Sequence, residues 1–145
     1  MELRLLNEQD MPELASAMND NYTQSQVRPE ELRVWFKSMA YIPAGIFIEG
    51  RLAAFAFCLR EGVAIRAKDV GLLHEYRSPE YSDRMLEMFK DWARDRGAER
   101  LIVETCANEL RAVELYKRGG LELKKHLPNR NGAEHGLELE VGLGG

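Results

Sequence analysis

The sequence predicts an α/β (α+β) fold, in which a mixed central sheet of about six to seven strands is flanked by about four helices. Two observations support this fold class. Short apolar runs typical of strands alternate along the chain with segments whose apolar residues recur at helical spacing. The length of 145 residues fits a single domain spanning residues 1–145, with enough chain to bury a core.

The first elements are a strand and two helices. The strand is predicted at residues 3–6, and Asn7 is an N-cap candidate for a helix over about residues 8–19. Pro29 is typical of a first helical turn and predicts a second helix that runs to about Met39.

The middle of the chain predicts a hairpin and a further strand. Glu49-Gly50 supplies the tight turn of the hairpin. The strand after it, at about residues 51–59, is nearly all apolar, as expected when both faces of a sheet are covered. Residues 63–76 predict another strand, or two strands with a bend, ending near His74.

A helix and a buried strand follow. Ser78 and Pro79 are typical of a helix start, and Gly97 is typical of a left-handed helix end. The strand is predicted at residues 100–107. Because a helix connects it to the preceding strand, we expect the two strands to be parallel.

The last elements are one helix and two strands. The helix is predicted from Asn108 to Gly119-Gly120. Residues 121–127 and 136–142 alternate apolar and polar side chains, which predicts two strands separated by a loop at residues 128–135.

The charge balance argues against a nucleic-acid or membrane partner. The formal net charge is −4 at pH 7, so the chain has no general electrostatic attraction to either surface. One basic stretch, from Lys117 to Arg130, is either solvated surface or an anion site.

The cysteines and the N-terminus indicate a cytoplasmic protein. Cys58 and Cys106 lie in apolar segments, and we interpret them as free thiols in a reducing compartment. No Cys or His spacing predicts a metal site. The first residues lack the apolar core of a signal peptide, and no apolar run approaches the roughly 20 residues of a membrane span.

The segment "ANELRAVELYKRGGLE" carries the most specific motif. An Asn precedes a helix with Ala and an apolar residue, then Leu-Tyr, and finally Gly and an apolar residue. Here these are Asn108, Ala112, Val113, Leu115, Tyr116, Gly120 and Leu121. With this motif and its order of elements, the chain resembles the GNAT superfamily of acyl-CoA-dependent N-acyltransferases over nearly its whole length. The resemblance implies acetyl-CoA as the cosubstrate.

Residues 77–82 resemble the pyrophosphate loop of that family, Gln/Arg-x-x-Gly-x-Gly/Ala before a helix. Arg77 and the small Ser82 fit the pattern, whereas Glu80 replaces the central glycine and Pro79 removes one backbone N–H. Glu80 is either a first-turn acid that stabilises the helix or a charge that repels a diphosphate. Arg77 offsets this charge by meeting a phosphate or by pairing with Glu80.

Acyl transfer from a thioester to an amine needs a base for the amine and a proton donor for the departing thiolate. The resemblance implies that Tyr116 is the donor, and a tyrosine phenol stays protonated near neutral pH. Glu104 and His74 are the candidate bases, and a chain of water molecules is the alternative.

The resemblance also implies where the cosubstrate lies. Backbone groups near Leu72 and Leu73 are expected to meet the pantetheine amide and the oxyanion, and Gly71 marks either a β-bulge or close packing. Asn108 either bonds the pantetheine arm or caps its helix. The expected cofactor-binding residues are Leu72, Leu73, Arg77, Ser78, Tyr81, Ser82, Asp83 and Asn108.

The sequence therefore predicts an N-acetyltransferase that transfers an acetyl group from acetyl-CoA to a primary amine of a small molecule or a protein. The alternative is a catalytically lapsed binding or regulatory module of the same fold. Acceptor specificity is expected from residues 7–39, which include Tyr22, and from residues 121–141. A homodimer through edge strands is compatible with such a fold.

Overall fold

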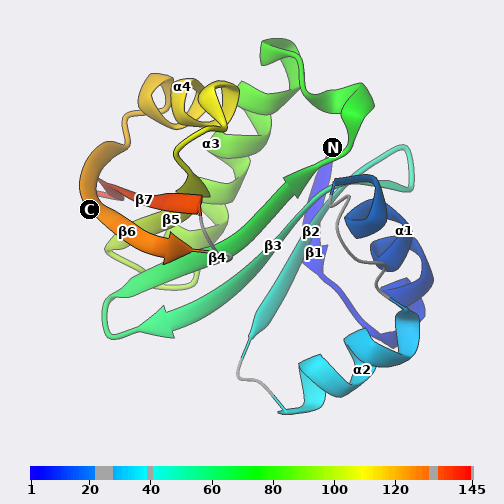
Figure 1. Cartoon of the computed structure of the whole chain (residues 1–145). Coiled ribbons are helices and arrows are strands. Elements are labelled where there is room, and N and C mark those ends of the chain that lie inside the picture. The colour runs from blue at the N-terminus through cyan, green and yellow to red at the C-terminus, as the bar shows by residue number, and fades with distance from the viewer. Residues whose placement is uncertain (22–27, 39–40, 131–133, 145) are drawn as a thin grey trace.

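The computed structural model describes residues 1–21, 28–38, 41–130 and 134–144, whose seven strands form one sheet (Figure 1). The strands are β1 (Glu2–Leu5), β2 (Ile42–Ile48), β3 (Arg51–Glu61), β4 (Ala64–Leu72), β5 (Arg100–Cys106), β6 (Glu122–Arg130) and β7 (Glu134–Gly142). The helices are α1 (Met11–Asn21), α2 (Pro29–Ser38), α3 (Pro79–Asp95) and α4 (Leu110–Arg118), with short 3₁₀ turns η1 (Glu8–Asp10) and η2 (His74–Tyr76).

The sheet is mixed, and its strand order is β1-β2-β3-β4-β5-β7-β6. The β4–β5 pair is parallel, and the other neighbouring pairs are antiparallel. The predicted fold class is therefore confirmed, including the parallel step through α3.

Local signals in the sequence account for the ends of several elements. The Asn7 side chain accepts a hydrogen bond from the Gln9 N–H at 2.9 Å, and the Asp10 carboxylate accepts one from the Asn7 N–H at 2.8 Å. This reciprocal capping starts η1, which leads into α1. In the β2–β3 turn, Glu49 and Gly50 have φ values of 52° and 79°, as a two-residue hairpin turn requires.

Helices cover both faces of the sheet. Helices α1 and α2 lie on one face, and α3 and α4 lie on the other (Figure 1). Strand β3 lies inside the sheet, between β2 and β4, so Phe55 and Phe57 pack toward α1 while Ala56 and Cys58 pack toward α3 and α4. This two-sided burial explains the nearly continuous apolar sequence of β3.

The C-terminal strands are longer than predicted. Antiparallel pairing continues to Arg130 opposite Glu134, so β6 and β7 include residues that the polar composition assigned to a loop. Backbone pairing does not require apolar side chains, which is why composition missed it. Residues 131–133, Met39 and Tyr22 lie outside the described residues.

Both cysteines are buried free thiols, as predicted. Burial raises the pKa of the Cys58 thiol to about 12, and the charge of Arg96 offsets this only in part. In the part of the chain that the structure describes, no helix is long and apolar enough to cross a membrane.

Candidate active site

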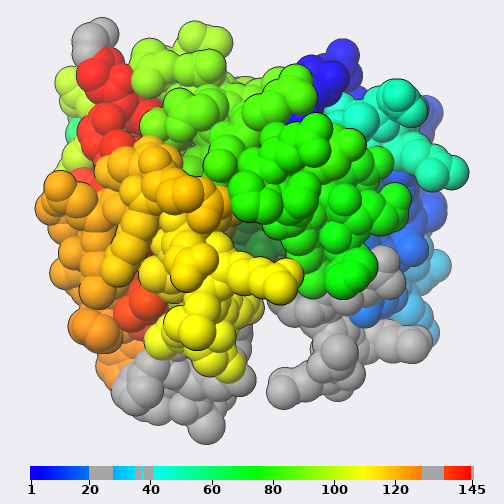
Figure 2. All heavy atoms as spheres, turned by 90° about the horizontal axis from the view of Figure 1, so that it is seen from above, coloured from blue at the N-terminus to red at the C-terminus, as the bar shows by residue number. Residues whose placement is uncertain are grey.

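The two parallel strands separate partway along their length. Strand β4 pairs with β5 from Ala64, opposite Arg100, to Ala67, opposite Val103. Residues 68–72 of β4 and 104–106 of β5, all described, do not pair with each other and leave a β4–β5 gap. Figure 2 shows the surface hollowed between the green segment and the yellow segment, whose colours match the end of β4 and the passage from β5 to α4.

The backbone of β4 presents hydrogen-bonding groups to this gap. In an antiparallel pair, the N–H and C=O groups of successive residues alternate between the two edges of a strand. The Leu73 N–H donates to the Ala53 carbonyl of β3 at 2.9 Å, so the groups of Leu72 and Val70 face the gap. The Leu72 carbonyl accepts a bond there from Arg77 Nε at 3.0 Å. The Leu73 N–H is thus already bound by β3, and the expected contact of backbone groups near Leu72 and Leu73 with the ligand stays a prediction.

Close packing explains Gly71. A Cβ at this position would lie 2.3 Å from Cζ of Phe55, so a side chain would collide with the ring. The β-bulge lies instead at Lys68, which the register between β3 and β4 skips. Because Lys68 directly follows Ala67, the bulge bends β4 where it leaves β5.

Tyr116 of α4 lies beside the gap. The residue is 5% exposed and lines an apolar cavity of about 50 Å³. Val70 and Leu72 of β4 and Val103 of β5 line the same cavity. The phenol therefore lies at the α3–α4 face of the gap, the position that the family resemblance implies for the proton donor.

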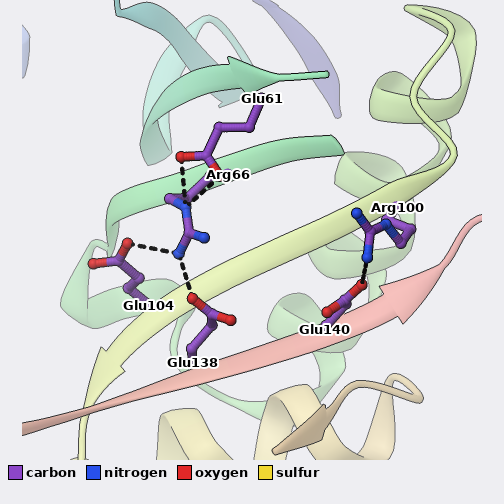
Figure 3. A network of polar contacts seen from close by, with 6 residues as sticks. All are labelled: Glu61, Arg66, Arg100, Glu104, Glu138 and Glu140. Carbon is purple, nitrogen blue, oxygen red and sulfur yellow. Dashed lines mark hydrogen bonds and ion pairs between the residues drawn. The ribbon is translucent and has the colours of Figure 1, made fainter. Parts of the chain in front are cut away.

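Glu104 approaches from the other face, within a polar group that we call the Arg66 cluster: Arg66, Glu61, Glu104 and Glu138 (Figure 3). Glu104 follows Val103, so its side chain points away from α3 and α4. Nη1 of Arg66 binds Glu104 at 3.0 Å and Glu138 of β7 at 2.6 Å, and its Nε binds Glu61 at 3.0 Å. The side chains of Arg66, Glu104 and Glu138 are 16%, 11% and 6% exposed.

The Arg66 cluster places three carboxylates around one guanidinium. Burial alone would lower the pKa of Arg66, but its hydrogen bonds to Glu138, Glu61 and Glu104 outweigh burial and hold that pKa above its usual value. Arg66 is therefore a permanent cation that orients the carboxylates and exchanges no proton itself.

Helix α3 begins at Pro79 with Ser78 at the N-cap position, as predicted, but the Ser78 side chain makes no capping hydrogen bond. The first four N–H groups of a helix are normally open to a ligand. Here Pro79 has no N–H, and the Tyr81 N–H donates to the Ser78 carbonyl at 3.0 Å. The helix start therefore offers an anion at most the N–H groups of Ser78 and Glu80.

Three predicted residues lie near this helix start. Glu80 is exposed, so its side chain lies in solvent. Arg77 precedes the helix and donates through Nε to the Leu72 carbonyl at 3.0 Å. His74 lies in the exposed turn η2 between β4 and α3.

The next three residues of α3 differ in what they contact. Ser82 is 4% exposed and lines the apolar cavity. Tyr81 packs edge-on against Tyr76 with a ring-centroid distance of 5.2 Å. Asp83 binds Arg118 of α4 at 2.8 Å. Of the three side chains, that of Ser82 faces the cavity, while those of Tyr81 and Asp83 have partners within the protein.

Asn108 does not cap α4. The N-cap residue is Glu109, whose carbonyl accepts the Val113 N–H at 3.1 Å, and Asn108 is exposed. The capping interpretation is therefore wrong, because the helix starts one residue later than predicted. A bond from Asn108 to the pantetheine arm stays a prediction.

Sequence reasoning missed Arg66 and Glu138. Both strands carry other charged residues, such as Lys68 in β4 and Glu140 in β7, so the sequence of either strand does not single out the buried charge. Buried charges need a partner, and finding it requires knowing which strands are neighbours. Among the residues that the structure describes, no cluster of three or more His, Cys, Asp or Glu side chains could hold a metal ion.

Comparison with protein-family models matches residues 8–120 of the chain to the acetyltransferase (GNAT) family. Curated protein sequences give no match. Solved structures give many matches in fold.

Three of the similar structures illustrate the shared fold. A ribosomal-protein-alanine N-acetyltransferase from Brucella melitensis has a TM-score of 0.79 and 17% identity, covering 98% of this chain and 99% of that one. A spermidine N-acetyltransferase chimera from Vibrio cholerae and hSSAT has a TM-score of 0.83 and 12% identity, covering 99% of this chain and 96% of that one. A phosphinothricin acetyltransferase from Sinorhizobium meliloti, in complex with AcCoA, has a TM-score of 0.78 and 13% identity, covering 99% of this chain and 88% of that one. At these identities the likeness shows the fold alone.

Proposed function

The chain belongs to the GNAT acetyltransferase family, and on this premise we propose that it is an N-acetyltransferase that transfers an acetyl group from acetyl-CoA to a primary amine of a small molecule or a protein. One observation carries the proposal. Strands β4 and β5 separate beside the buried Tyr116, where an extended thioester arm would meet both an open strand edge and a proton donor.

Tyr116 is the proposed proton donor. The reaction breaks the bond between the acyl carbon and sulfur and forms one between the acyl carbon and nitrogen. The amine loses a proton and the departing thiolate gains one. A phenol is protonated near neutral pH, and Tyr116 lines the cavity at the β4–β5 gap.

Glu104 is the proposed base. It follows Val103, the last residue of β5 that pairs with β4, so Glu104 and Tyr116 approach the gap from opposite faces of the sheet. A proton taken up by Glu104 would weaken its ion pair with Arg66, which would still bind Glu138 and Glu61.

His74 and a chain of water molecules are the alternatives to Glu104. Comparing Glu104→Gln with His74→Asn separates them, because removing a general base lowers turnover by about 100-fold or more. We expect that loss for Glu104→Gln and little change for His74→Asn. The opposite result would assign the base to His74. If both variants keep their activity, a chain of water molecules would take up the proton.

The two ends of the proposed acetyl-CoA site fit their ligand unequally. The edge of β4 at Val70 and Leu72 does not pair with β5, although Arg77 binds the Leu72 carbonyl, and this edge and the apolar cavity suit the pantetheine arm and the acyl group. The diphosphate would meet the N–H groups of Ser78 and Glu80 and the nearby Arg77, fewer backbone donors than a glycine-rich helix start provides.

A second candidate function is a lapsed module of the same fold that binds acyl-CoA weakly or not at all. The helix start favours it, since Pro79 lacks an N–H, Tyr81 uses its own within the turn, and Glu80 adds a negative charge.

The amine is proposed to enter on the face of α1 and α2, where the three carboxylates of the Arg66 cluster exceed its one guanidinium and favour a cationic acceptor. The two buried free thiols support the proposed cytoplasmic location. Pairing of two copies through the edge strands β1 and β6 remains part of the proposal.

Calorimetric titration with acetyl-CoA, on the wild type and on Glu80→Gly, tests the proposed function. Release of CoA is then measured with spermidine, a peptide with an N-terminal alanine, and phosphinothricin, the acceptors named for the similar structures. Binding by both proteins with CoA release by the wild type supports the enzyme. Binding by the glycine variant alone supports a lapsed module whose helix start is blocked by Glu80. Absence of binding by both proteins refutes the enzyme.

A further inference from the structure

The cavity beside Tyr116 extends away from the β4–β5 gap along the face of the sheet that α3 and α4 cover. Tyr116 and Val103 line it near the gap, whereas Leu3 of β1, Ile46 of β2 and Met85 of α3 line it on strands and helix turns farther from β5. The cavity therefore starts where the proposed thioester lies and continues beneath α3.

Small side chains on the sheet create this space. Ala44 of β2 and Ala54 and Ala56 of β3 line the cavity and are 2%, 5% and 6% exposed. Ala44 and Ala56 are direct partners across the strand pair, so two methyl groups lie side by side opposite α3. Protein interiors are otherwise closely packed, with few voids larger than one water molecule.

The cavity has an apolar lining that disfavours water. Its lining side chains are apolar except for Ser82 and Tyr116. Its volume of about 50 Å³ is several times the roughly 10–15 Å³ that one water-sized group needs. A chain of methylene groups matches both the chemistry and the size of such a space.

We propose that this cavity receives the tail of the acyl group, so that the chain prefers short acyl-CoA thioesters of about three to four carbons, such as butanoyl-CoA, over acetyl-CoA. The proposal rests on the proposed function, since it assumes that the thioester carbonyl lies beside Tyr116. The carbonyl of the acyl group lies at the gap, and the carbons that follow it point along the sheet toward Ala56 of β3.

The test is a calorimetric series on the full chain with CoA, acetyl-CoA, propanoyl-CoA, butanoyl-CoA and hexanoyl-CoA. Burying one methylene group strengthens binding about fourfold, so we expect Kd to fall about 15-fold from acetyl-CoA to butanoyl-CoA. Hexanoyl-CoA should gain nothing further, because the cavity is filled.

Two variants change the cavity in opposite directions. Ala56→Val adds volume to its wall and should abolish the advantage of butanoyl-CoA while acetyl-CoA still binds. Met85→Ala enlarges the cavity and should shift the tightest binding to hexanoyl-CoA. Met18→Ala is the matched control, because Met18 and Met85 are both 3% exposed and Met18 packs in the cluster beneath α1 and α2. The control should leave the series unchanged.

The outcomes separate the inference from the proposed function. Equal Kd values for acetyl-CoA and butanoyl-CoA, or weaker binding of butanoyl-CoA, overturn the acyl pocket and leave the acetyltransferase intact. The pocket is also overturned if Ala56→Val and Met85→Ala both leave the Kd values of the series unchanged. Absence of binding by every CoA compound overturns the pocket together with the proposed function.

Discussion

The two ends of the proposed acyl-CoA site differ in how they are built. At the β4–β5 gap, an open strand edge, the buried Tyr116 and the Arg66 cluster meet around the proposed reaction centre. At the start of α3, at most two backbone N–H groups remain open, and Glu80 adds an acidic side chain in solvent. The chemistry of the first end is embedded in the core, and that of the second depends on a few exposed residues.

The difference teaches which part of such a site the fold itself maintains. The bulge at Lys68 and the contact between Gly71 and Phe55 shape β4 at the gap, so losing that geometry would disturb the sheet. At the helix start, an acid such as Glu80 stabilises the helix by roughly 0.3–1 kcal/mol. The chain can therefore lose phosphate-binding features without losing stability, but it cannot lose the gap as easily.

The largest effect is expected at the gap, for Tyr116→Phe. Removing a general acid lowers kcat by about 10²- to 10⁴-fold, while Kd for acetyl-CoA should change by less than about threefold. Release of CoA and calorimetry measure the two quantities. Tyr41→Phe is the control, because Tyr41 packs against Phe57 on the opposite face and should keep full activity. Full turnover by Tyr116→Phe would remove its assignment as proton donor.

The second-largest effect is expected for a substitution in the Arg66 cluster. Arg66→Met leaves three carboxylates without their shared cation, and breaking such a buried pair lowers the free energy of unfolding by about 3–5 kcal/mol. Urea unfolding measures the loss. Arg100→Met is the control, since Arg100 is 51% exposed and its pair with Glu140 contributes about 1 kcal/mol or less. Equal losses for the two variants would show that the Arg66 cluster has no special role in the sheet.

A smaller effect is expected at the helix start. Glu80→Gln removes one negative charge near the proposed diphosphate and should lower Kd for acetyl-CoA by about tenfold or less, because solvent screens an exposed charge. The gain should shrink as salt is added. Glu87→Gln, an exposed acid farther along the same helix, should leave Kd unchanged. A gain of several hundredfold would mean that Glu80 controls binding and that the helix start is the decisive end.

The smallest effect is expected for Asp83→Asn. Asp83 and Arg118 form an exposed pair, with side chains that are 45% and 43% exposed, and such pairs contribute roughly 0.2–1 kcal/mol. The melting temperature should fall slightly, and Kd for acetyl-CoA should change by less than about threefold. A large loss of affinity would show that Asp83 itself orders the ligand site.

The order of elements could be predicted from the sequence because its signals are local. The capping of η1 by Asn7, the turn at Glu49-Gly50 and the start of α3 at Pro79 each depend on residues close together in the chain. The family motif likewise identified Tyr116 from a single helix, and the structure places this residue at the gap.

Other features could not be predicted, because they depend on strand pairing. Whether Leu72 or Leu73 faces the gap follows from the register between β4 and β3. The Arg66 cluster exists because β7 inserts beside β5 and brings Glu138 opposite Glu104. Neither fact follows from the sequence of one strand. Sequence reasoning therefore identified Glu104 as a candidate base but did not find Arg66 and Glu138, which lie on neighbouring strands.

Comparing acetyl-CoA with S-acetylpantetheine, which lacks the diphosphate and the nucleotide, tests most directly whether the gap end supplies most of the binding. Calorimetry on the wild type gives both Kd values. We predict that both compounds bind and that their Kd values differ by about tenfold or less, or about 1.4 kcal/mol. Tight binding of acetyl-CoA with S-acetylpantetheine weaker by about 1,000-fold or more, or no binding of either compound, would contradict this division of the site.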